Sequence, residues 1–421
     1  MLVNPALVVA LIAAPPVVER FELSNGVRAV VVHVPDAPKQ TTFTFLPLSL
    51  ATDGPNEAQW SHLVEHLLIR STDPHALQAD GMEFNGETGP ECLRLDSYAA
   101  PEQWRASIER HAKWLAARSF DADTLEREKV MIAGEERGTS TSGFTHKWAI
   151  AAWNQIIRHG LDHAAVHGDV AGASVESVMG AARARLPIDQ SVLIATIGPA
   201  EPDAVRAAMQ EMLGGLPVGM PDASRKKAAA PRLEGDVTAT WDLPTRHVLI
   251  WWRLPDASPA TRAAATALFM DAQMRLQTLK VGGEKPGVVL IHPVVNTPEG
   301  SCFIVNLRLA PGIDPAAARN EVVQAMNSGN PEMALRLGRM NAMNWGPAPD
   351  FAASRRNLQG RMRDLLEGQW LLTRSMEEFN WGMPAEAIAG SLRELTAESI
   401  RPVAERLRGA PTGSLVLEPR D

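Results

Sequence analysis

The strongest constraint on the fold is a break in composition near the middle of the chain, with a similar order of elements on either side. Residues 214–234 are rich in Gly, Pro and Ala and show no apolar periodicity, which is typical of an interdomain linker. Before this break, 20–34 and 41–50 are predicted strands, and a helix follows them. After it, 236–254 supplies strands and 259–280 a long helix. The repeated order predicts a duplicated α+β module.

Further elements are predicted in both halves. Asn25-Gly26 favours a tight hairpin turn between two strands. A helix starting at Asp123 has Glu126 three places on, as in a capping box, and stops at Gly138. The remaining predictions are helices at 102–118, 123–137 and 201–214, a buried strand at 191–198, and a last strand at Cys302–Leu309 followed by mostly helical sequence to Arg408.

Bulk composition excludes several classes of protein. The 421 residues are 45% hydrophobic, which supports a substantial core rather than disorder. A net charge of −8 argues against a nucleic-acid binder, and the longest basic run, 225–227, lies in the predicted linker. The two cysteines, Cys92 and Cys302, form no CxxC pair, so neither a structural zinc knot nor a disulfide framework is expected.

The N-terminus carries a short apolar run, Ala6–Ala14, followed by Pro15-Pro16. This resembles the core and end of a signal peptide, although no basic residue precedes it. Because of this signal-like run we expect a periplasmic or secreted protein, with a cytoplasmic location as the alternative. The alternative interpretation of the run itself is a disordered tail or an edge strand. No run approaches the ~20 apolar residues of a spanning helix, so no membrane span is expected.

A metal-ligand pattern, H-x-x-E-H, lies at His62, Glu65 and His66. On a helix, residues four apart project from one face, so both imidazoles can reach one metal ion. Glu65 lies at the edge of that face, where it can approach a metal-bound water without being a ligand. This is the inverzincin arrangement. The alternative is an ordinary helix with two core histidines and a surface glutamate.

A catalytic zinc needs a third protein ligand, and the helix beginning at Asp123 offers several carboxylates. Glu128 and Glu135 are two helical turns apart and share a face, so one can bind metal while the other orients a ligand. The alternative is a solvated acidic helix. The other acidic residues of this segment are Glu126 and Glu136.

Four segments together resemble the pitrilysin/insulinase family of zinc peptidases, which includes the mitochondrial processing peptidase and bacterial relatives. HLVEHLL at 62–68 matches the family's zinc motif. EREKVMIAGEE at 126–136 matches its downstream stretch, in which a glutamate precedes the ligand glutamate by seven residues. GMEFNGET at 81–88 is similar to its G-x-x-N-A-x-T strand, with Gly86 in place of Ala, and NGVRAVVV at 25–32 is similar to its opening strand.

The resemblance implies a role for each matching residue. His62, His66 and Glu135 would bind one Zn²⁺ per chain. Glu65 would act as general base on the attacking water. Glu128 would support a ligand through a hydrogen bond.

The resemblance also implies substrate contacts, and here the chain departs from the family. Asn85 would bind the backbone of an extended substrate at the sheet edge. Arg275 stands where the family has a substrate-binding arginine. The family's nearby tyrosine is missing from 281–291, and the only tyrosine, Tyr98, lies in the first half. A partner subunit could supply the missing group; otherwise activity is expected to be weak.

The expected fold is α+β: two similar halves, each a mostly antiparallel sheet covered by helices, closing like a clam shell. The implied function is a zinc metallopeptidase hydrolysing peptides or unfolded segments, as a homodimer or a heterodimer with a related subunit. The alternative is a non-catalytic peptide-binding or assembly subunit. The predicted divisions are a signal-like or disordered segment at 1–16, a zinc-binding catalytic domain at 17–213, a linker at 214–234 and a substrate-enclosing domain at 235–421.

Two further patterns favour a structural rather than a functional interpretation. His159, His163 and His167 recur every four residues, but glycines interrupt the segment, so we interpret it as a loop with incidental histidines. In Trp251-Trp252, strand alternation predicts one ring in the core and one outside.

Overall fold

The computed structural model describes most of the chain in two halves. It covers residues 16–50, 53, 57, 59–72, 81–89, 91–117, 120–138, 142–159, 170–185, 188–218, 234–241, 243–297, 300–342 and 348–419. The signal-like run at 6–14 lies outside the described residues, as do 219–233 of the predicted linker. The division into domains at 17–213 and 235–421 therefore stays a prediction.

The first half is built on a six-stranded sheet that is antiparallel except for the β2–β6 pair. Gly26, at a φ of 85°, closes the predicted hairpin between its first two strands. In sheet order, the strands are β1 (Val17–Glu22), β2 (Arg28–His33), β6 (Leu193–Gly198), β3 (Gln40–Leu46), β5 (Leu93–Ala99) and β4 (Glu83–Thr88).

The second half is built on a five-stranded sheet that repeats this topology. Its one parallel pair, β7–β11, corresponds to β2–β6, and its other pairs are antiparallel, as in the first sheet. The structure thus confirms two similar, mostly antiparallel sheets. In sheet order, the strands are β7 (Gly235–Trp241), β11 (Gly413–Pro419), β8 (His247–Arg253), β10 (Gly300–Leu309) and β9 (Gly287–Thr297).

The prediction that Cys302–Leu309 forms the last strand is wrong. Residues Gly413–Pro419 return after the C-terminal helices and pair with both β7 and β8. This strand is short and apolar, and it lies between two others in the sheet. Its partners are far away in the sequence, so no local turn signal marks the pairing.

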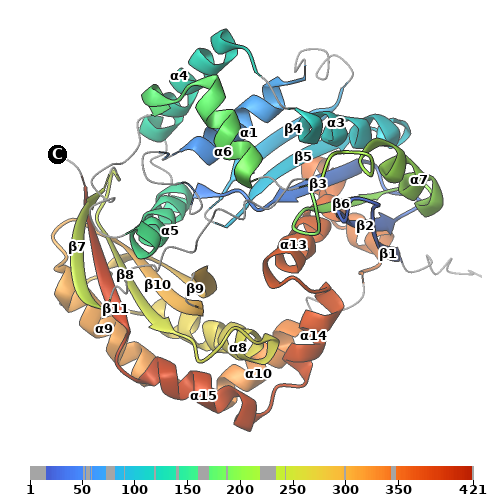
Figure 1. Ribbon diagram of the computed structural model, residues 1–421. Helices are drawn as coiled ribbons and strands as arrows, with labels where there is room; N and C mark the ends of the chain where they lie inside the picture. The colour runs from blue at the N-terminus through green and yellow to red at the C-terminus, as the bar shows by residue number, and fades with distance from the viewer. Residues whose placement is uncertain are drawn as a thin grey trace, which may run out of the picture.

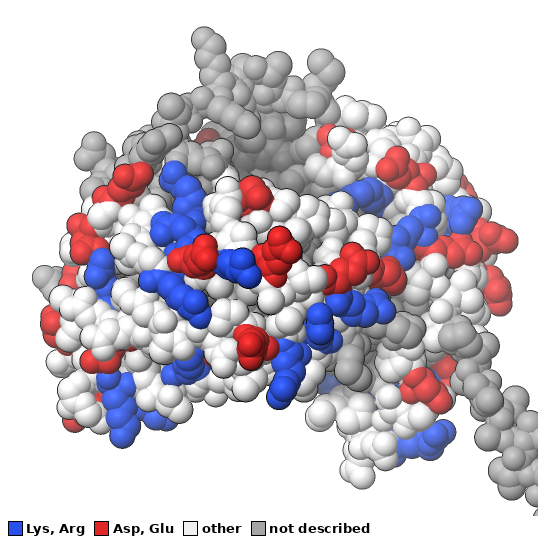
Figure 2. All heavy atoms as spheres, turned by 90° about the horizontal axis from the view of Figure 1, so that it is seen from below, with Lys and Arg blue, Asp and Glu red and all other residues white. Residues whose placement is uncertain are grey.

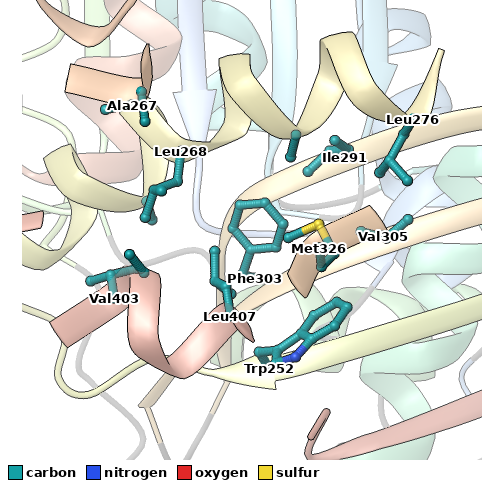
Figure 3. Packing of buried hydrophobic residues seen from close by; sticks show 14 of the residues in the cluster. Trp252, Ala267, Leu268, Leu276, Ile291, Phe303, Val305, Met326, Val403 and Leu407 are labelled. Carbon is teal, nitrogen blue, oxygen red and sulfur yellow. The ribbon is translucent and has the colours of Figure 1, made fainter. Parts of the chain in front are cut away.

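Helices cover the outer face of each sheet, so the halves have separate cores. Over the first sheet lie α1 (Trp60–Arg70), α3 (Trp104–Ala116), α4 (Ala122–Gly138), α6 (Val175–Arg185) and α7 (Pro202–Met212). Over the second lie α8 (Pro259–Leu276), α9 (Pro315–Asn327), α10 (Pro331–Asn341), α14 (Ala385–Arg393) and α15 (Ala397–Arg408). Figure 3 shows the second core, where Phe303 and Trp252 of the sheet meet Leu407 of α15.

The inner faces are covered by helices exchanged between the halves. Helix α5 (Ser142–His159) follows the first-half elements but packs on the second sheet, where Trp153 meets Trp251 edge to face. Helix α13 (Leu366–Trp381) belongs to the second half but packs on β3 and β6, where Phe379 stacks on Phe45. Short helices α11 (Phe351–Arg355) and α12 (Gly360–Asp364) precede it. Figure 1 shows both exchanged helices between the two sheets of the clam shell.

The exchange corrects the prediction for the tryptophan pair. Trp252 is buried under the outer helices and Trp251 under α5, so both rings lie in cores. Alternation along the strand was predicted correctly, but the second face of the sheet is covered rather than open. Both rings are therefore structural.

The surface shown in Figure 2 carries acidic and basic side chains interspersed, with neither sign forming a large continuous field. Among the described helices, none is long and apolar enough to span a membrane.

Candidate metal centre

Helix α1 carries the H-x-x-E-H pattern and is held between the first sheet, α4 and α6. Its apolar residues Leu63, Val64, Leu67 and Leu68 are buried in the first core. Because these four side chains fix the rotation of the helix, the polar positions between them face one common side.

The three proposed metal ligands meet at one point. His62 Nε2 lies 3.3 Å and His66 Nε2 3.7 Å from the same carboxylate oxygen, Oε2 of Glu135 on α4. One ligand atom from each residue lies within 4.8 Å of the others. Ligands placed ~2.1 Å from a tetrahedral zinc would be roughly 3.4 Å apart, so this trio fits the ion.

The remaining ring nitrogens are engaged by other groups. Nδ1 of His66 lies 2.8 Å from Glu128 Oε2, and Nδ1 of His62 lies 3.3 Å from Gln59 Oε1. Both acceptors are oxygens, so with a metal bound each ring would donate from Nδ1 and offer the lone pair of Nε2 to the ion. Arg70 donates to the other oxygen of Glu128 at 2.9 Å and holds that buried carboxylate in place.

Glu65 is buried beside the trio and held by strand β4. Thr88 Oγ1 donates to its Oε2 at 2.7 Å. A Cβ added to Gly86 would lie 2.4 Å from Glu65 Oε1, so the glycine leaves the space that the carboxylate occupies. The side chain of Glu65 is therefore fixed by packing and by one hydrogen bond.

The electrostatics of the site favour a cation. Burial alone would lower the pKa of His66, but hydrogen bonds with Glu135 and Glu128 and the charge of Glu65 raise it to about 9. Hydrogen bonds with His62 and His66 hold the pKa of Glu135 far below its usual range. A field that stabilises an imidazolium also stabilises a divalent metal ion.

The other predicted substrate residues lie apart from this trio. Asn85 is exposed on β4, the edge strand of the first sheet. Arg275 is not brought to the site: its guanidinium donates to Asp271 and to the Ala325 carbonyl, contacts that tie α8 to α9. Tyr98 lies on β5, where its hydroxyl is 3.5 Å from Asp96.

Three contributors to the site were not predicted from the sequence. Arg70 continues the helical series of His62 and His66 at the next i+4 position, so its proximity to Glu128 could have been inferred. Gln59, with a φ of 67°, precedes the helix and reaches His62 from a position that periodicity does not mark. Trp148 comes from the exchanged helix α5, with its ring 6.2 Å from that of His62.

Of the three histidines predicted to lie in a loop, only His159 falls within the described residues. His159 is the last residue of α5, while His163 and His167 lie outside the described residues. Within the described part of the chain, His62, His66 and Glu135 form the one group with metal-ligand spacing.

Comparisons with known proteins give the fold. No family model and no curated protein matches the chain. A protease from Helicobacter pylori has 15% identity and a TM-score of 0.67, over 96% of this chain and 100% of that one. A peptidase M16 inactive domain from Pseudomonas fluorescens has 13% identity and a TM-score of 0.67, over 96% and 98%. The periplasmic protease PqqL from Escherichia coli has 13% identity and a TM-score of 0.62, over 97% of this chain and 48% of that one. The chain therefore has the two-half fold of M16-type peptidases.

Proposed function

We propose that this chain is a zinc-dependent metallopeptidase that hydrolyses peptides or unfolded polypeptide segments. The observation that carries the proposal is the meeting of both Nε2 atoms with one oxygen of Glu135, beside a buried glutamate that is not part of the trio. The likeness of the fold to a protease from Helicobacter pylori supports the same conclusion.

Each step of hydrolysis has a candidate residue. His62, His66 and Glu135 would hold the zinc ion, which when bound polarises a peptide carbonyl and acidifies water. Glu65 would accept the proton of the attacking water and deliver it to the leaving amine. Thr88 keeps the carboxylate of Glu65 in one orientation.

Substrate positioning is proposed for the edge strand β4. An extended peptide would add to this edge through backbone hydrogen bonds, with Asn85 as a side-chain contact. The substrate would then lie against the strand that holds Glu65, since Thr88 and Gly86 belong to the same strand.

A weaker or partner-dependent activity is the second candidate. Arg275 is committed to contacts within its own half, and 281–291 contains no tyrosine to hold a developing oxyanion. One structural relative is described as an inactive M16 domain, and another carries this fold in about half of a longer chain. We therefore propose a homodimer or a heterodimer with a related subunit, in the periplasm or secreted.

The test compares wild type with Glu65→Gln, using a quenched-fluorescence peptide library with and without chelator, and metal analysis of both proteins. We expect one zinc per chain in both, and a ~10²–10⁴-fold loss of cleavage in the variant. Glu126→Gln, on the exposed side of α4, is the matched control and should cleave normally. Equal rates for Glu65→Gln and wild type would reject the general-base role. Zinc without cleavage, restored by a second protein, would identify the heterodimer.

A further inference from the structure

A cavity of about 500 Å³ lies between the two halves. Its walls come from the β4–β5 turn of the first half, from the exchanged helices α5 and α13, and from α8, β9 and α14. Most of the lining is apolar, including Ile150, Phe269, Ile291, Val295, Met376 and Trp381.

The polar lining carries an excess of carboxylate. Arg94 is already engaged, since it pairs with Glu87 at 3.0 Å and with Asp96 at 2.7 Å. That leaves Glu91 and Glu377 with the guanidinium of Arg262 as the nearby cation for both. Two carboxylates against one guanidinium leave a net negative charge in a largely apolar enclosure.

Glu91 is the more exceptional of the two acids. Its carboxylate makes no hydrogen bond or ion pair with any described residue, and the residue is half-buried and lines the cavity. Burial and the nearby Glu377 raise the pKa of Glu91 to about 7, against the opposing effect of Arg262. Burial also raises the pKa of Glu377. A cation bound in the cavity would stabilise the ionised form of both carboxylates and so lower both pKa values.

Neutral groups complete the polar lining. Burial lowers the pKa of His292 to about 4 and raises that of the Cys92 thiol to about 12, so neither carries charge at neutral pH. Neither residue therefore offsets the carboxylates.

The alternation of β4 connects this cavity with the metal centre. Gly86 and Thr88 face Glu65, so Glu87 faces the opposite side of the sheet, where it lines the cavity. A peptide added to the β4 edge would alternate in the same way and direct every second side chain to the cavity side. Helix α5 makes a second connection: Trp148 contacts His62, and Ile150 lines the cavity.

We infer that the cavity is a specificity pocket that binds a lysine or arginine side chain of the peptide substrate, with Glu91 and Glu377 facing the cationic group. This inference rests on the proposed function. The apolar walls suit the methylene stem of such a side chain, and the carboxylates suit its head. A purely hydrophobic side chain would leave the two carboxylates with only Arg262 as a nearby cation, and Glu377 with its hydrogen bond to Trp381.

The test measures peptide binding without cleavage. Zinc-loaded Glu65→Gln protein is titrated with two fluorescent peptides that differ only in lysine against norleucine, which keeps the stem and removes the charge. We expect the lysine peptide to bind at least ~10-fold more tightly, a preference of the size expected for a charged hydrogen-bonded contact. Adding Glu91→Gln and Glu377→Gln should reduce the preference below ~2-fold and leave norleucine binding unchanged. Glu211→Gln on the surface is the control.

The outcomes separate this inference from the proposed function. A lysine preference that survives the two cavity substitutions, no preference in the starting protein, or no binding of either peptide overturns the pocket assignment. A preference that depends on both glutamates, in a wild-type protein that cleaves neither peptide, supports the pocket and contradicts the peptidase. Glutamine has the shape of a protonated glutamate, so the folded protein should accept these substitutions.

Discussion

Helices α1 and α8 occupy the same place in the two halves, yet only one of them carries chemistry. Helix α1 follows β3, which pairs with β6, the last strand of the first half. Helix α8 follows β8, which pairs with β11, the last strand of the second half. Each helix packs against its own sheet. Helix α1 presents two histidines and a glutamate to one side. Helix α8 is rich in buried alanine, and its one acidic residue, Asp271, is paired with Arg275.

The difference shows how a duplicated scaffold becomes asymmetric. The alanines of α8 allow α10 to approach closely: a Cβ on Gly338 would lie 2.6 Å from the Cβ of Ala267. In α1 the space beside the helix is instead taken by the polar groups of α4 and β4. The same topology therefore provides tight packing in one half and a candidate metal centre in the other.

The largest effect is expected from removing a ligand in α1. His66→Ala should reduce zinc from one ion per chain to about none, because two remaining ligands do not hold the ion. Met274→Ala, at an exposed position of α8, should change neither metal content nor cleavage. Metal analysis after dialysis and a peptide-cleavage assay check both variants. Full zinc occupancy in His66→Ala would contradict the ligand assignment.

A smaller loss is expected from Glu128→Gln, which weakens the support of His66. The variant should bind zinc ~10–100-fold more weakly, as is usual when the hydrogen-bonding partner of a ligand is lost. Competition with a fluorescent chelator measures the affinity, with Glu126→Gln on the same helix as the matched control. An unchanged affinity would show that Glu128 is only a partner of Arg70.

These two predictions rest on residues that the sequence identified, and the reason is local. His62, Glu65 and His66 share one helix, and Glu128 and Glu135 share another, so helical spacing was sufficient to group each set. That the two sets meet came from the family resemblance. The exchange of α5 and α13 could not be predicted, because the apolar pattern of a helix does not say which sheet it covers. The cavity depends on that exchange and was missed with it.

The exchanged helix α5 offers a contrast in charge with the metal centre. Burial lowers the pKa of His146 on α5 to about 3, and the pKa values of His247 and His292 on the second sheet to about 4. The rings of His146 and His247 lie 5.2 Å apart, and Asn306 hydrogen-bonds both residues. These histidines are neutral in the folded protein, whereas the unfolded chain protonates them near pH 6.5.

The sign of the pH effect follows from these directions. Below pH 6.5 the unfolded state binds more protons, so the free energy of unfolding falls as the pH drops from about 6.5 towards 4. His146→Phe removes one such group and should reduce the loss of stability between pH 7.5 and 5 by about 2 kcal/mol. Urea unfolding at pH 7.5 and at pH 5 measures this loss of stability, with His33→Gln as the control. An identical loss in His146→Phe and wild type would show that His146 is not buried in the neutral form.

The smallest effect separates the two possible roles of Arg275. If its guanidinium serves only to tie α8 to α9, Arg275→Ala should lower the free energy of unfolding by about 1–2 kcal/mol, because the buried carboxylate of Asp271 loses a charged partner. Asp271 keeps the backbone amide of Asn330 as a donor, which limits the cost. The KM and kcat for peptides should stay within about twofold of wild type, since the side chain makes no contact with the metal trio. Urea unfolding and peptide kinetics on the same preparation measure both quantities. A raised KM with unchanged stability would instead assign Arg275 to substrate and would make the second half a direct participant in binding.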